Sequence, residues 1–110
     1  MSSTAAIPAI SAAVAGIHAD AYEREHERIS TLLDDDLVMC ILRVELSPAE
    51  QLLMDSHHGD AVREQREAFE QTLAPSMTAA VERATGRAVT TCSTTTHLEP
   101  SLTLILFMFA

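Results

Sequence analysis

Two ionisable side chains two positions apart, His97 and Glu99, are the residues best suited to chemistry. They lie in the segment 96–100, Thr-His-Leu-Glu-Pro, which we expect to form a loop between two strands. Imidazole titrates near neutral pH and a nearby carboxylate can exchange its proton, so the two residues could serve as an acid–base pair. A solvated turn closed by Pro100 accounts for the same residues without any reaction.

Arginine offers a second chemistry, because the planar guanidinium group binds a carboxylate or a bicarbonate ion through two parallel hydrogen bonds. Arg43 and Arg87, together with His97, could line a pocket for such an anion between two copies of the chain. The candidate ligand-binding residues are therefore His97, Glu99, Arg43 and Arg87. No catalytic residue is assigned.

Metal binding is the third possibility, and the pattern disfavours it. Asp34, Asp35 and Asp36 supply the carboxylates that Mg²⁺ or Ca²⁺ prefers, but a turn that enters a strand favours aspartate for its own geometry. His57 and His58 are neighbours and point in different directions, so an exposed loop between helices explains them better than a zinc site. His18 and His26 belong to no such pattern. We expect no metal and no cofactor.

Several classes of function are excluded by composition. All seven basic residues are arginines, which excludes a Schiff-base lysine and the lysine of a phosphate-binding loop. The net charge of −9 repels a phosphate backbone, so we expect no nucleic-acid partner. Neither a Gly-rich phosphate loop nor a nucleophile motif is present, and Cys40 and Cys92 are expected to be reduced thiols within strands.

The chain has the length of one domain, 1–110. No basic residue precedes Arg24, so the apolar start lacks the positive region of a signal peptide, and the run 102–110 is about half of what a membrane helix needs. We therefore expect a cytoplasmic protein without direct membrane insertion, peripheral at most to a membrane complex.

Periodicity predicts an α+β fold with an N-terminal helix. Ile7, Ile10, Val14 and Ile17 recur at helical spacing, whereas the stretch from Ala19 to Leu33 fits helix and strand equally. The segment 47–50, Ser-Pro-Ala-Glu, carries an N-cap, a proline and a capping-box glutamate that open a helix. A second helix is predicted from Asp60 to a C-cap at Gly86, with a kink or short break at Pro75.

The strands are predicted at 37–46, 87–95 and 101–109, in a small, mainly antiparallel sheet with the helices inserted between two strand pairs. In the last strand Leu102, Leu104, Leu106 and Met108 alternate with Ile105, Phe107 and Phe109, so both faces need cover. Helices can cover one face. A second copy of the chain is a simple cover for the other, so we expect a homo-oligomer.

The segment from Asp34 to Ala110 resembles the MpsC type of Na⁺-translocating membrane-potential-generating system. The resemblance rests on D-D-L at 35–37, L-[ST]-P-x-E at 46–50, R-x-x-F-x-x-x-[ML] at 66–73, A-V-E-x-x-T-G-R at 80–87, and a His with a proline turn at 97–100. The chain departs from the family pattern at Glu23–Arg28, where a Gly-Pro linker is usual. It also has Ser101 in place of the second acid of the proline turn.

The resemblance implies an accessory component of a membrane system that couples ion movement to membrane potential or bicarbonate uptake, with a membrane protein as a possible partner. It supplies no catalytic residues. The first hypothesis is therefore a non-enzymatic interaction module. The alternatives are an anion sensor that binds its ligand between subunits and a minor enzyme that uses His97 and Glu99.

Overall fold

The computed structural model describes residues 3–22 and 28–110, which form three helices and four strands. In chain order these are α1 (Ser3–Tyr22), β1 (Arg28–Leu33), β2 (Leu37–Arg43), α2 (Pro48–Asp55), α3 (Gly59–Thr85), β3 (Val89–Leu98) and β4 (Ser101–Phe109). The ambiguity between Ala19 and Leu33 is resolved on both sides: helix continues to Tyr22 and strand begins at Arg28. Residues 23–27, with His26 and most of the divergent linker, lie outside the described ranges.

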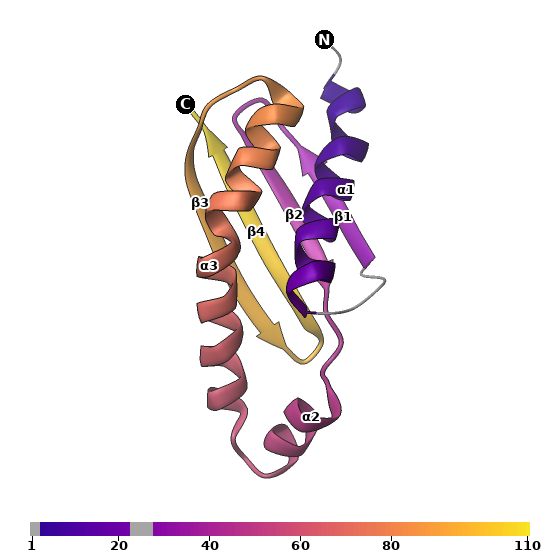
Figure 1. Cartoon of the computed structure of the whole chain (residues 1–110), viewed down its shortest axis with the longest axis vertical. Coiled ribbons are helices and arrows are strands. Elements are labelled where there is room, and N and C mark those ends of the chain that lie inside the picture. The colour runs from indigo at the N-terminus through magenta and orange to yellow at the C-terminus, as the bar shows by residue number, and fades with distance from the viewer. Residues whose placement is uncertain (1–2, 23–27) are drawn as a thin grey trace.

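The four strands form one antiparallel sheet in the order β1-β2-β4-β3. Helices α2 and α3 are inserted between the hairpins β1–β2 and β3–β4, as predicted, and the α+β fold is confirmed. Figure 1 shows α1 and α3 side by side on the same face of the sheet, while α2 lies beyond one end of it. We call the helix-covered side the inner face and the opposite side the outer face.

The hydrophobic core lies between the inner face and the two long helices. Alternating residues of the two central strands point inward, as their period of two requires, and meet the apolar stripes of α1 and α3. The buried cluster consists of Ala6, Ile10, Val14, Val38, Cys40, Met77, Val81, Ile105, Phe107 and Phe109. The alternation predicted for β4 is confirmed, and β2 alternates in the same way.

The predicted bounds of two strands were wrong, and at Pro75, where a kink or a short break was expected, the break is absent because α3 continues through this residue. Strand β3 extends to Leu98, so the expected loop 96–100 is a tight turn at Glu99 and Pro100, joined by a cis peptide bond. The reason is pairing: Thr96 and His97 stand opposite Thr103 and Leu102, and Leu98 is buried on the inner face. Strand β2 ends at Arg43 rather than residue 46.

Candidate functional site

The outer face of the sheet carries an ordered grid of side chains, because three antiparallel pairings bring alternate residues into rows across the strands. From β1 to β3 the rows are Arg28–Arg43–Leu102–His97, Ser30–Ile41–Leu104–Thr95, Leu32–Met39–Leu106–Ser93 and, over three strands, Leu37–Met108–Thr91. Eight neighbouring residues are apolar, and we call them the apolar block: Leu32, Leu37, Met39, Ile41, Leu102, Leu104, Leu106 and Met108.

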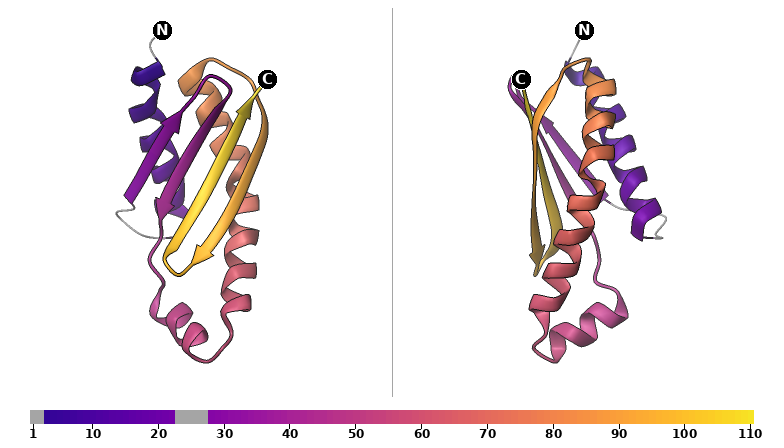
Figure 2. Two further views of the ribbon diagram at one scale, coloured as in Figure 1. Left: turned by 180° about the vertical axis from the view of Figure 1, so that it is seen from behind. Right: turned by 60° about the vertical axis from the view of Figure 1, so that its left-hand side comes forward.

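No described helix covers the apolar block. Seen from behind, the four strands face the viewer and both long helices lie beyond them (Figure 2). Leu32 and Met108 expose 57% and 43% of their surface, and the outward residues of the central strands are half-buried by their neighbours in the sheet. The outer face thus places a continuous apolar surface against solvent, the usual property of a protein-binding surface.

The charges on the outer face are separated along the strands. The first row has Arg28, Arg43 and the imidazole of His97, all exposed. Beyond the opposite end of β1 lies Asp34, an exposed residue of the β1–β2 turn. Its backbone N–H donates to the carbonyl of Leu37 at 2.9 Å, and its carboxylate accepts the backbone N–H of Asp35 at 2.8 Å. The outer face therefore has a basic end and an acidic corner, with the apolar block between them.

A second polar centre joins α2 to α3 and to the sheet. Arg66 of α3 is buried, and its Nε and Nη2 donate to the two carboxylate oxygens of Glu50 at 2.9 and 3.0 Å. Its other N–H groups donate to the carbonyls of Val44 and Glu45 and to the hydroxyl of Ser101. All five donors of the guanidinium group are thereby used. Arg66 is a structural cross-link and has no donor left for a ligand.

Glu50 reaches Arg66 because the predicted capping box is present. The backbone N–H of Glu50 donates to the hydroxyl of Ser47 at 3.1 Å, and that of Ser47 donates to the Glu50 carboxylate at 2.9 Å. The hydrogen bonds from Arg66 hold the pKa of Glu50 below its ordinary value, since they favour the ionised carboxylate.

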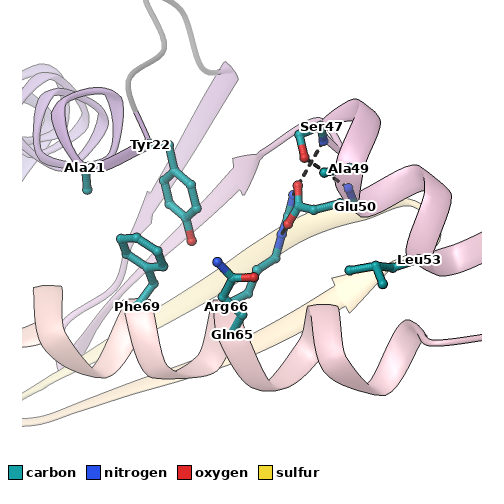
Figure 3. Close-up of a pocket in the computed structure, with 9 residues that line it drawn as sticks. All are labelled: Ala21, Tyr22, Ser47, Ala49, Glu50, Leu53, Gln65, Arg66 and Phe69. Carbon is teal, nitrogen blue, oxygen red and sulfur yellow. Dashed lines mark hydrogen bonds and ion pairs between the residues drawn. The ribbon is translucent and has the colours of Figure 1, made fainter.

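A pocket of about 310 Å³ opens beside this cross-link. Figure 3 shows Tyr22 and Phe69 facing each other on one side, with ring centroids 5.1 Å apart, and Leu53 of α2 on the other side. The Glu50–Arg66 pair lies at its polar edge. Because Arg66 is saturated, the pocket offers an apolar surface with few directed polar contacts.

The helices α1 and α3 are joined by a buried pair that sequence analysis missed. His18 Nδ1 donates to the carbonyl of Val14 at 3.0 Å, and Nε2 lies within hydrogen-bond distance of both carboxylate oxygens of Glu70. Both side chains are fully buried. Since Nδ1 carries a proton, Nε2 and the carboxylate must share one more proton, whichever atom holds it. Neither the spacing of 52 residues nor the isolated His18 gave a signal of this contact.

The four candidate ligand residues lie at three places. His97 and Glu99 share a shallow hollow of about 350 Å³ with Asp60 and Arg63. Arg43 stands in the same row as His97, separated from it by Leu102. Arg87 is at the other end of the sheet, where it donates to the carbonyl of Asp35 at 2.6 Å and covers the ring of Phe109. The structure brings His97 and Glu99 together and keeps Arg87 apart from them.

The cysteines, aspartates and histidines considered above as thiols or metal ligands do not form a site among the described residues. Cys40 and Cys92 form no disulfide; burial raises the pKa of Cys40 to about 11 and also raises that of Cys92, so both thiols are protonated at neutral pH. Asp34–Asp36 form the exposed turn between β1 and β2, and His57 and His58 are exposed between α2 and α3. Over residues 3–22 and 28–110 no three ligand-type side chains gather as a metal site would require.

Comparison with known proteins identifies a family. The model of the family described as Na⁺-translocating membrane potential-generating system (MpsC) matches residues 6–110. No curated protein and no solved structure matches the chain. Within the part of the chain that the structure describes, no helix is both long and apolar enough to cross a membrane.

Proposed function

Since the chain belongs to the MpsC family of Na⁺-translocating membrane potential-generating systems, we propose that it serves such a system as a non-enzymatic accessory module that binds other protein chains. The apolar block on the outer face is the observation that carries the proposal. Eight apolar side chains on three neighbouring strands, β1, β2 and β4, exceed the scattered apolar residues normal for a surface, and an interaction partner is their physical explanation.

The polar centres support binding rather than catalysis. Arg66 has committed every donor to the fold, and the His18–Glu70 pair is closed off from solvent. Both thiols are protonated and therefore poor nucleophiles. These buried ionisable side chains hold the helices to one another and to the sheet, and the chemically able groups that remain, such as His97 and Glu99, are exposed.

The proposal is tested in cells that lack their own copy and receive a variant gene. Leu104→Glu places a charge in the middle of the apolar block, whereas Leu52→Glu places the same charge on α2, where Leu52 is already 66% exposed. We expect Leu104→Glu to lose the sodium-dependent membrane potential and any linked bicarbonate uptake, and Leu52→Glu to keep both. A folded Leu104→Glu protein that restores the potential fully would contradict the proposal.

An anion sensor is the second candidate, and it is favoured by one observation: Arg43 and His97 stand in one exposed row. Calorimetry with bicarbonate on the parent chain and on His97→Ala separates this candidate from the first. A heat of bicarbonate binding that is seen with the parent chain and is lost in His97→Ala would favour the sensor. Absence of heat in both proteins would remove it, together with the acid–base enzyme if turnover is also absent.

A further inference from the structure

We propose that the outer face binds the same face of a second copy, with the strands of the two sheets running in opposite directions, so that Arg28 of each copy meets Asp34 of the other. This inference rests on the proposed function, because it names the partner of the apolar block. It is carried by the size of the outer face and by the placement of its charges.

The size of the outer face suits a small dimer. Four strands about 4.8 Å apart give a width of about 19 Å, and seven residues at about 3.4 Å give a length of about 24 Å. The flat area is about 450 Å², and protruding side chains raise the accessible area toward the ~600 Å² per partner at the lower end of stable interfaces. We therefore expect a dissociation constant on the order of micromolar rather than nanomolar.

The charges of the outer face suit a second copy because the positive end of one copy can face the negative end of the other. A two-fold axis in the plane of the interface repeats every contact, so a patch that pairs with itself needs both signs at related positions. Arg28 lies at one end of β1 and Asp34 just beyond the other end. An axis perpendicular to the strands places β1 over β1 with its direction reversed. Each Arg28 then lies near the partner's Asp34, while the apolar central strands cover each other.

The other two-fold arrangement is less favourable. An axis parallel to the strands places β1 over β3, so that Arg28 faces the His97 position and Asp34 faces the neighbourhood of Thr91. Among the residues of the four rows no opposite charges then meet, and Glu99, in the turn beyond His97, shares its hollow with Asp60 and Arg63 of α3. A lipid surface is a poorer partner too, because the net charge of −9 opposes anionic headgroups. Face-to-face packing also buries the apolar block without backbone hydrogen bonds from the edge strands β1 and β3.

The experiment measures association by sedimentation equilibrium at 50 mM and 1 M NaCl. Arg28→Asp and Asp34→Arg are each expected to weaken the dimer about tenfold at low salt, because each puts like charges together at two symmetric places. The double variant is expected to return to within about threefold of the parent, since the exchanged charges meet again. Glu67→Arg, an exposed change on α3 with the same charge difference as Asp34→Arg, is the control and should keep the parent constant.

The outcomes separate the inference from the proposed function. A dimer without rescue in the double variant overturns the antiparallel arrangement, and a dimer that survives Leu104→Glu overturns the choice of face. A parent chain that stays monomeric at 100 µM, with or without flotation on phosphatidylglycerol vesicles, overturns the second copy as partner. The proposed function is decided independently by the membrane potential of cells with Leu104→Glu. Unfolding curves for every variant confirm that the compared proteins are folded.

Discussion

At the scale of single residues, Arg66 is the side chain that holds α3 to α2, to the segment that follows β2 and to the start of β4. We expect Arg66→Lys to destabilise the chain by about 3 kcal/mol, because an ammonium group cannot reproduce the bidentate contact with Glu50 or reach the carbonyls of Val44 and Glu45 as well. Urea unfolding gives the change in free energy. Arg83→Lys, an exposed change on the same helix, is the control and should stay within about 0.5 kcal/mol of the parent.

The ionisation of Glu50 makes part of this stability depend on pH. The hydrogen bonds from Arg66 lower the pKa of Glu50 in the folded chain below 4.5, so its stabilisation is present above pH 4.5 and is lost as pH falls through the folded value. In Glu50→Gln this loss of unfolding free energy at low pH should be absent. Unfolding free energies from pH 3 to 7 check it: the gap between parent and variant should narrow below pH 4.5. A constant gap would show that the charge of Glu50 contributes nothing.

At the scale of elements, the His18–Glu70 pair is a buried polar contact that holds α1 against α3. Glu70→Gln can still donate a hydrogen bond to Nε2, whereas Glu70→Ala leaves a buried nitrogen without that contact and a small cavity. We expect a loss of about 1 kcal/mol for Gln and about 3 kcal/mol for Ala. Hydrogen exchange should show faster opening of α1 in Glu70→Ala while the β2–β4 pairing stays protected. Equal losses of protection along α1 in the two variants would contradict the role of the pair.

Local patterns predicted most of these elements, and contacts between distant segments account for what they missed. Alternation separated the residues of the two faces of β4, and the capping box at Ser47 located the start of α2. The extension of β3 to Leu98 was missed because it depends on the partner strand β4 rather than on the Thr-rich sequence. The Arg66 cross-link and the His18–Glu70 pair join side chains 16 and 52 positions apart, and a single sequence contains no local signal for such contacts.

At the scale of the whole molecule, a dimer through the outer face should make thermal stability depend on protein concentration. Only the folded chain associates, so dimer formation raises the free energy of unfolding. A tenfold rise in protein concentration adds about 1.4 kcal/mol per dimer to it, which raises Tm by about 3 °C for a domain of this size. Leu104→Glu should unfold at a Tm that does not change with concentration, while Leu52→Glu, with its charge on α2, should follow the parent. Scanning calorimetry from 10 to 1,000 µM measures both. A parent Tm that is constant across this range would mean that the apolar block is exposed in a solitary molecule, and its partner would then have to be a different chain.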